Sequence, residues 1–397
     1  MEFGFTEEEE AFRQEVRKFL DKEMPQGLII PIVNLAEDLY RDDVWQLHKV
    51  MARKLGEKGW LSLDWPRECG GQGLSPMYSA IFQEEMRYRG APGWDPQGVS
   101  MVAPLLIHFG TEEQKKEHLP PIARGEVFWC EGYSEPQVGS DLASVQTMAV
   151  EDGDAFVVNG QKLWTSGAHV TDWCQLVART NPNTPKKYQG LTHFLVDMKT
   201  PGIEVRPIRD ICNGRGLCEV FFDNVRIPNE NIVGQKDHGW ETALALLSFE
   251  RGLDAGSTGL MRAFFDLMLR YLKEHHLTDK PAVRQNLANV FIEMETARLL
   301  AYKVVWSACK GLPAGTPAST NPFAGDIQDV ASPRPLMAIP PLWCCTRGCN
   351  PALVLAMQGH FSLPAPMTLP KILRPGSPRE LKLRLKILQI LLVTRPM

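Results

Sequence analysis

The spacing of apolar residues changes twice along the chain, from a helical period to strand-like alternation and back. Over residues 44–55 apolar side chains recur three and four positions apart, which is the pattern of an amphipathic helix. The runs at 192–196 and 220–227 are short, rich in β-branched and aromatic residues, and bounded by turn residues, as in strands. Helical spacing returns at Gly239. We therefore predict an α+β fold in which a sheet region lies between two helical regions.

The same changes set the expected domain limits. The last part of the chain is rich in proline and keeps no sustained helical period, so the C-terminal helical bundle is expected to be incomplete. We predict an N-terminal helical domain over 1–127, a central β-barrel-like domain over 128–236, the first two helices of a C-terminal bundle over 237–311, and an aberrant tail over 312–397.

Three helix starts carry capping signals. Thr6 and Thr111 are each followed three residues later by Glu or Gln, which is the spacing of a capping box. Ser75-Pro76 combines an N-cap residue with proline at the first helical position. We expect helices to begin directly after these residues.

The β region contains two polar segments, residues 129–141 and 161–167, with two hairpin signals between them. Asp152-Gly153 and Asn159-Gly160 are dipeptides that supply positive φ in tight turns. We predict that both polar segments are turn-like loops on neighbouring strands, and that a flat ligand would fit between them.

Composition excludes several classes of protein. The formal net charge of −4 offers no basic surface for nucleic acid, and no apolar run approaches the roughly 18 residues of a membrane span. Residues 1–24 lack the basic start of a signal peptide, and nine cysteines lack the spacing of a disulfide framework, so we expect a cytoplasmic protein. No metal site is expected, because the cluster of Cys344, Cys345 and Cys349 lacks a fourth ligand.

Several separated motifs occur between residues 3 and 310. They are Trp65-Pro66 with Gly70-Gly71-Gln72-Gly73, Gly110-Thr111-Glu112-Glu113-Gln114-Lys115, Tyr133-Ser134-Glu135-Pro136 with Gly139-Ser140-Asp141, 159–167, 222–228, and Phe249-Glu250-Arg251-Gly252. In this order they resemble the acyl-CoA dehydrogenase family of flavoenzymes. The resemblance implies bound FAD, oxidation of an acyl-CoA to the trans-2-enoyl-CoA, and an electron-transfer flavoprotein-like acceptor. It also implies a homodimer or homotetramer, whose assembly the aberrant tail would compromise.

Carried over by position, the two polar segments would line the isoalloxazine, with Ser166 near its N5. The family usually has Gly-Ala where this chain has Gln137-Val138, and we expect these side chains to crowd the loop. Arg284 would replace an arginine that the family uses at the FAD pyrophosphate of a neighbouring subunit. The alternative interpretation is a pair of capped hairpin loops with one core tryptophan. The implied cofactor-binding residues are Tyr133, Ser134, Gly139, Ser140, Trp164, Thr165, Ser166, Arg284 and Gln285.

The catalytic base is expected to be Glu250. In the isovaleryl-CoA dehydrogenase type the base lies on the long helix after the β domain and is followed by arginine, as Glu250 is here. Leu244 and Leu247 precede it on the helix, and partial burial beside them would suit a general base. The alternative is an exposed Glu–Arg pair of little energetic value. The residues implied to bind the acyl-CoA or support the base are Ser140, Ser248 and Arg251.

For the tail we hypothesise translation one nucleotide out of frame. Segments 318–322 and 366–373 can be encoded so that another frame gives sequences that the family favours. The nucleotide sequence of the gene tests this hypothesis. Two other functions stay open: an acyl-CoA oxidase, in which oxygen reoxidises the flavin, and a catalytically silent subunit or product whose broken bundle binds little FAD. The apolar pattern does not specify the length or branching of the acyl chain.

Overall fold

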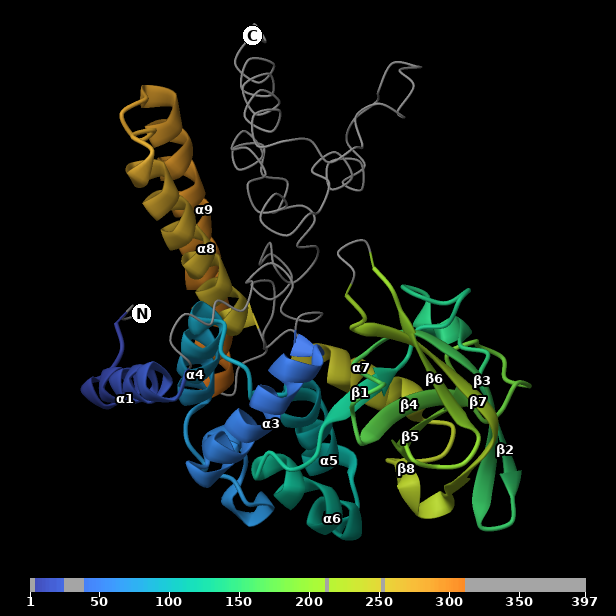
Figure 1. Ribbon diagram of the computed structural model, residues 1–397. Coiled ribbons are helices and arrows are strands. Elements are labelled where there is room, and N and C mark those ends of the chain that lie inside the picture. Colours follow the sequence, from blue (N-terminus) through green and yellow to red (C-terminus); the bar gives the residue numbers. More distant parts are fainter. Residues whose placement is uncertain (1–3, 25–38, 211–213, 251–253, 311–397) are drawn as a thin grey trace, which may run out of the picture. The chain divides into compact units, whose positions relative to one another are not determined.

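The computed structural model describes residues 4–24, 39–210, 214–250 and 254–310, and it has helices on both sides of a sheet region in the sequence (Figure 1). The helices before the sheet are α1 (Glu7–Glu23), α3 (Asp42–Glu57), α4 (Pro76–Arg89), a π-helical turn (Gly98–Val102), α5 (Ala103–Phe109) and α6 (Glu112–Ala123). The helices after it are α7 (Gly239–Glu250), α8 (Asp254–Glu274) and α9 (Pro281–Cys309). The predicted α+β class is confirmed. The predicted tail and its three cysteines lie outside the described residues.

The predicted helix starts are confirmed at the level of individual hydrogen bonds. Thr6 and Thr111 each accept a bond from the third backbone N–H of the following helix, and the Glu9 and Gln114 side chains bond back to the N-cap N–H. Ser75 Oγ accepts from the Met77 N–H, with proline at the first helical position. These signals are local, so the sequence determines them without reference to the rest of the fold.

The strands form one mixed sheet in the order β6-β7-β3-β2-β4-β5-β8, and β1 pairs with β4 in parallel. The turn at Gly153 joins β2 to β3 as predicted, with φ of +66°. The strand limits are β1 Trp129–Gly132, β2 Met148–Asp152, β3 Ala155–Ser166, β4 Trp173–Arg179, β5 Leu191–Asp197, β6 Ile203–Ile208, β7 Leu217–Pro228 and β8 Ile232–Val233.

The second predicted hairpin turn, at Asn159-Gly160, is wrong, because both residues lie inside β3. Val158 pairs with Val225 and Gly160 pairs with Phe222. The two pairs are thus two residues apart on β3 but three residues apart on β7, so β7 carries a bulge there. Asn224 lies in the bulge with φ of +51°, and its N–H donates to Asn159 Oδ1 at 2.8 Å. A Cβ on Gly160 would lie 2.8 Å from Thr147 Cα. The two residues therefore support a bulge and a close strand approach rather than a turn.

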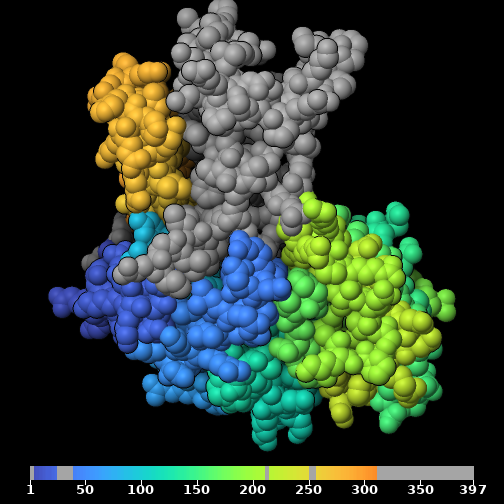
Figure 2. Space-filling view, in the orientation of Figure 1, coloured from blue at the N-terminus to red at the C-terminus, as the bar shows by residue number. Residues whose placement is uncertain are grey.

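Two apolar cores lie against the sheet. The first joins the helices before the sheet to one side of it, and Figure 2 shows the blue helical residues bordering the green sheet residues. Its members include Leu55 and Leu106 from the helices, Trp129 and Leu195 from the sheet, and Leu246 from α7. The second is formed by the sheet itself and includes Phe156, Phe194 and Phe222. The helices and the sheet thus share the first core, whereas the second belongs to the sheet alone.

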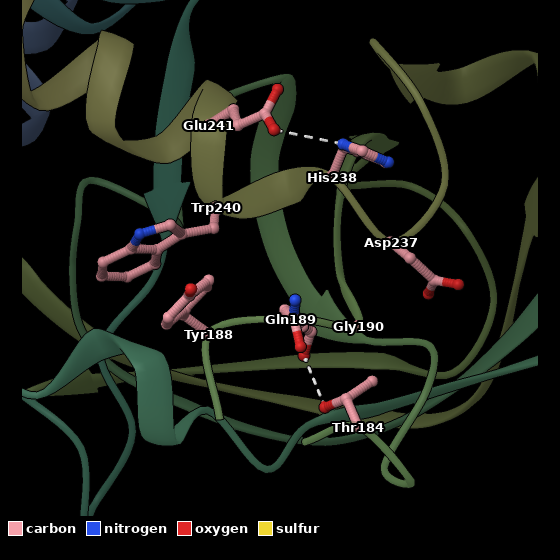
Figure 3. A pocket seen from close by; sticks show the side chains of 8 residues that line it. All are labelled: Thr184, Tyr188, Gln189, Gly190, Asp237, His238, Trp240 and Glu241. Atoms are coloured by element: carbon pink, nitrogen blue, oxygen red, sulfur yellow. Dashed lines mark hydrogen bonds and ion pairs between the residues drawn. The ribbon is translucent and has the colours of Figure 1, made fainter. Parts of the chain in front are cut away.

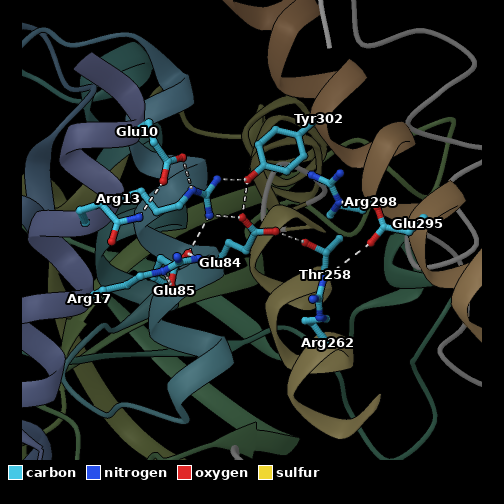
Figure 4. Close-up of polar contacts among 11 residues, drawn as sticks. Glu10, Arg13, Arg17, Glu84, Glu85, Thr258, Arg262, Glu295, Arg298 and Tyr302 are labelled. Carbon is cyan, nitrogen blue, oxygen red and sulfur yellow. Dashed lines mark hydrogen bonds and ion pairs between the residues drawn. The ribbon is translucent and has the colours of Figure 1, made fainter. Parts of the chain in front are cut away.

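A group of charged side chains joins α1, α4 and α9 (Figure 4). Arg13, buried on α1, contacts Glu84 Oε2 at 2.6 Å and Glu85 Oε1 at 2.7 Å. Tyr302 on α9 donates to Glu84 Oε2 at 2.6 Å, and Arg17 binds Glu85 through both carboxylate oxygens. These buried ions are mutually compensated, as buried charges must be.

The chain divides into two compact units, and among the described residues the second unit contains 272–293. In it α8 ends with a turn in which the Leu277 N–H bonds the Leu272 carbonyl at 2.9 Å. Pro281 then opens α9 at the first helical position. In the described ranges no helix combines the length and apolar content that crossing a bilayer requires.

Candidate functional site

The two polar segments meet directly after β1. The carbonyl oxygen of Ser134 accepts a hydrogen bond from the Leu163 N–H at 2.9 Å. The preceding carbonyl, that of Tyr133, accepts from Lys162 Nζ at 3.0 Å. Two successive residues of one segment are thus joined to two successive residues of the other. The gap that we expected for a flat ligand is closed at this point, and segment 161–167 is not a loop, because β3 continues to Ser166.

A second bulge places Trp164 on the surface. Lys162 pairs with Val220 and Thr165 pairs with Cys218, so β3 advances three residues against two on β7. Trp164 has φ of +64°, which is rare for a bulky residue, and 56% of its surface is exposed. Strain of this kind costs about 1–3 kcal/mol and concentrates at functional sites.

The bulge leaves the two residues after Trp164 in different settings. Thr165 is buried, and its Oγ1 has no hydrogen-bond partner in the described part of the chain. Ser166, at the end of β3, is half-buried. A buried hydroxyl without a partner is costly, and a ligand or an ordered water can satisfy it.

The first segment ends in a tight turn. The N–H of Glu135 bonds the Val138 carbonyl at 2.8 Å, and the N–H of Val138 bonds the Glu135 carbonyl at 2.9 Å. Gln137 is exposed and Val138 packs in the core, so the turn accommodates both side chains without the crowding that we expected. Gly139 and Ser140 follow on the surface, and a Cβ on Gly139 would meet no atom of the described residues within 4 Å. The backbone there is open to a ligand.

Beneath these segments lies an ion pair that the sequence interpretation missed. Lys162 is fully buried, and its Nζ lies 2.9 Å from Glu135 Oε1. The Glu135 carboxylate also accepts the N–H groups of Gln146 at 2.8 Å and Thr147 at 2.9 Å. Burial opposes the charge on Glu135, but Lys162 and these hydrogen bonds outweigh it and hold the pKa of the carboxyl below its usual value. The sequence did contain a signal for the burial of Lys162. Lys162 is an even number of residues from the core residues Phe156 and Val158, so regular strand alternation places it on the same, buried face.

Helix α7 carries the predicted base at its last residue. Its Ala243 and Leu246 are buried, whereas Leu244 is exposed. Ser248 is exposed as well, and its Oγ donates to the Leu244 carbonyl at 2.9 Å. The Glu250 side chain and Arg251 lie outside the described residues.

The other end of α7 is tied to the sheet and to the first segment. His193 on β5 is fully buried and its Nδ1 lies 3.1 Å from Thr242 Oγ1. Its ring also makes an edge contact with Tyr133, with 5.8 Å between the centroids. Burial lowers the pKa of His193 to about 3, so the imidazole is neutral at physiological pH. This histidine was not predicted, and no motif marks it.

The residues predicted for the FAD pyrophosphate are in the second unit. Arg284 and Gln285 are exposed in the first turns of α9, where the Gln285 side chain donates to Asn289 at 3.2 Å.

A pocket of about 300 Å³ lies apart from all the predicted residues, between the 184–190 segment and the start of α7 (Figure 3). Tyr188 and Trp240 lie on one side of it, with ring centroids 6.1 Å apart. The Arg179 guanidinium fixes the 184–190 segment by donating to the carbonyls of Lys187 and Gln189. The same guanidinium donates to the carbonyls of Ala143 and Val145, so one side chain holds both the pocket wall and the chain after the first polar segment.

In the described ranges no three His, Cys, Asp or Glu side chains are grouped to hold a metal ion.

Comparison with known proteins identifies the fold. The acyl-CoA dehydrogenase N-terminal, middle and C-terminal domains match residues 6–126, 130–225 and 237–321. Acyl-CoA dehydrogenase IpdE1 of Mycobacterium tuberculosis is 35% identical over 74% of this chain and 76% of its own, and acyl-CoA dehydrogenase FadE26 of the same organism is 32% identical over 81% of both. Among solved structures, the Tcur3481-Tcur3483 steroid ACAD is 30% identical with a TM-score of 0.77, over 85% of this chain and 86% of that one. The chain therefore belongs to the acyl-CoA dehydrogenase family, whose members are oxidoreductases that act on acyl-CoA.

Proposed function

We propose that this protein binds FAD on its two polar segments and dehydrogenates an acyl-CoA to the trans-2-enoyl-CoA with Glu250 as the base. The observation that carries the proposal is the direct joining of the segments through Ser134 and Leu163, next to the exposed, strained Trp164. Two motifs that are about 30 residues apart in the family pattern thus form one surface. Membership of the family, whose members are FAD-dependent, makes flavin the expected ligand of that surface.

The residues present fit a flavin. Among the described residues the buried Thr165 Oγ1 lacks a hydrogen-bond partner and no atom blocks the Gly139 backbone, while Ser140 presents a hydroxyl at the surface. These neutral donors and acceptors suit the ring nitrogens and carbonyls of an isoalloxazine, which carry no full charge. We propose that FAD is held by Tyr133, Ser134, Gly139, Ser140, Trp164, Thr165 and Ser166. We propose that Arg284 and Gln285 bind the pyrophosphate of the FAD of a neighbouring subunit. When bound, FAD supplies the acceptor for the hydride from the β-carbon.

The protein's own part in the reaction is proton removal and orientation. The α-proton of a thioester is a very weak acid. A carboxylate must therefore be held close to the α-carbon, in surroundings that favour the neutral carboxylic acid that forms when it takes up the proton. We assign this role to Glu250, with Ser140, Ser248 and Arg251 binding the acyl-CoA or supporting the base. The contact between His193 on β5 and Thr242 fixes the N-terminal end of α7 against the sheet.

The first experiment is the visible spectrum of the purified protein, followed by titration with acyl-CoAs. We expect a flavin spectrum that bleaches with the right thioester. The panel includes straight, branched and steroid-derived acyl groups, because one of the similar structures is a steroid ACAD. Peroxide release during turnover in air would favour an oxidase over our proposed electron-transfer flavoprotein-like acceptor. A folded protein that binds no FAD would refute the proposal and favour a silent product.

The base is tested by Glu250→Gln. We expect the rate of flavin bleaching to fall about 10²–10⁴-fold, the usual contribution of a general base, while the flavin stays bound. Glu230→Gln is the matched control, because Glu230 is exposed in a 3₁₀ turn outside the proposed site. An unchanged bleaching rate in the Glu250 variant would exclude this glutamate as the base. The assembly that we propose, a homodimer or homotetramer, is measured by light scattering.

A further inference from the structure

The buried Lys162–Glu135 pair connects three parts of the chain. Lys162 is on β3, Glu135 is in the turn of the first polar segment, and the two N–H groups that Glu135 accepts lead into β2. Lys162 also bonds the Tyr133 carbonyl. The pair therefore joins β3, the start of the 133–141 segment and the start of β2 through one lysine and one carboxylate.

Stability alone does not account for charges at this position. Apolar side chains of similar volume often replace a buried ion pair at no cost in stability, because burying two charges is itself unfavourable. What apolar side chains cannot replace is direction. Nζ donates to two acceptors at 2.9 and 3.0 Å, and the carboxylate accepts three donors, so the loop is held in one orientation.

The position of the pair on β3 relates it to the proposed flavin surface. Lys162 precedes Leu163, which bonds the Ser134 carbonyl, and Leu163 precedes the bulge at Trp164. Two successive carbonyls of the loop are thus held by two successive residues of the strand, immediately before the strand exposes its tryptophan. A shift of the loop by one residue would separate Ser134 from the bulge.

We propose that Lys162 and Glu135 are positioning residues, which hold the 133–141 segment against the β3 bulge so that the flavin-binding groups are in place before FAD binds. This inference rests on the proposed function. Neither side chain contacts the proposed ligand surface as a donor or acceptor, since the polar atoms of both are used inside the protein. They act through the backbone of Tyr133 and Ser134.

The test measures two quantities in the apoprotein, amide hydrogen exchange and FAD affinity. In the unsubstituted apoprotein we expect the amides of Gln146, Thr147 and Leu163 to exchange slowly, because each is held by this arrangement. In Lys162→Met we expect faster exchange across 133–141 and a dissociation constant for FAD raised about tenfold or more, as for other residues that orient a binding group. Lys236→Met is the control, because Lys236 pairs with Glu151 at the surface of the same sheet. It should change neither quantity.

Lys162→Met leaves Glu135 buried without its partner and can fail to fold. The variant E135Q/K162M removes both charges and keeps an amide that accepts from the Gln146 or Thr147 N–H. We expect it to unfold cooperatively but to keep the fast exchange and the weak FAD binding. Normal exchange in 133–141 and normal FAD affinity in this folded variant would refute the inference. If the unsubstituted protein binds no FAD, the proposed function fails, and the exchange measurement alone decides whether the pair holds the two segments together.

Discussion

Acidification should destabilise the protein through His193. The hydroxyl of Thr242 donates to the Gly239 carbonyl at 3.0 Å, so it accepts from His193, whose Nδ1 must carry the proton. Nε2 then has a lone pair that is buried without a partner in the described residues. A second proton on this ring would place a charge in the core, and burial accordingly lowers the pKa of His193 from 6.5 to about 3.

The size of the effect follows from proton linkage. Between pH 7 and pH 5 the unfolded imidazole takes up a proton while the folded imidazole stays neutral, which lowers the free energy of unfolding by about 2 kcal/mol. This amount hardly depends on the folded pKa, because that value lies well below 5. The contribution of His193 to the free energy of unfolding is fully present above pH 6.5 and falls as the pH drops toward 3. Below pH 3 it falls no further.

The assay is urea unfolding of the apoprotein and of His193→Asn at pH 7 and pH 5, followed by tryptophan fluorescence. The asparagine amide of this variant can still donate to Thr242 but does not titrate. Two other buried groups also change the free energy of unfolding between pH 7 and pH 5. Asp95 increases it as the pH falls, because burial raises the pKa of Asp95 to about 7, and His48 decreases it, because burial lowers the pKa of His48 to about 3. Both groups are present in the two proteins, so the difference between the proteins isolates His193. We expect the pH dependence of the variant to be smaller by about 2 kcal/mol. Equal pH dependence in the two proteins would refute the buried, neutral assignment.

Two further predictions concern stability. Arg13→Met should lower the free energy of unfolding by about 3 kcal/mol or more, because it leaves two buried carboxylates without their shared cation. Arg206→Met, which breaks an exposed pair with Glu204, should have a much smaller effect. Calorimetry measures both losses, and equal losses would contradict the role of burial. Gly160→Ala should cost about 1–3 kcal/mol because its Cβ would collide with Thr147. Gly139→Ala, in open space, should stay within about 0.5 kcal/mol of the parent, so similar melting shifts for both would argue against the close approach.

The features that the sequence predicted correctly are those encoded locally. The capping boxes at Thr6 and Thr111 need only four consecutive residues, and the turn at Gly153 needs only its dipeptide. Asn159-Gly160 carries the same kind of signal but forms no turn. Its outcome depends on Asn224 in β7, about 65 residues away, and no local pattern contains that information.

The candidate site was predicted in part for the same reason. The motifs indicated that 129–141 and 161–167 belong together, and the structure joins them at Ser134 and Leu163. Which way each side chain points was not predictable, because the bulge between Lys162 and Thr165 reverses the alternation of β3. Simple alternation would bury Trp164 with Phe156, and the bulge exposes it instead.

The shared core has a consequence for biosynthesis. The helices before the sheet bury their apolar faces against Trp129 and Leu195, and the same core is completed by Leu246 on α7. When only the first 127 residues have emerged from the ribosome, the apolar faces that these helices later bury against the sheet are still uncovered. The nascent chain must stay unaggregated until about 120 further residues have emerged. A truncation inside the sheet should then yield an insoluble helical fragment, not a smaller stable protein.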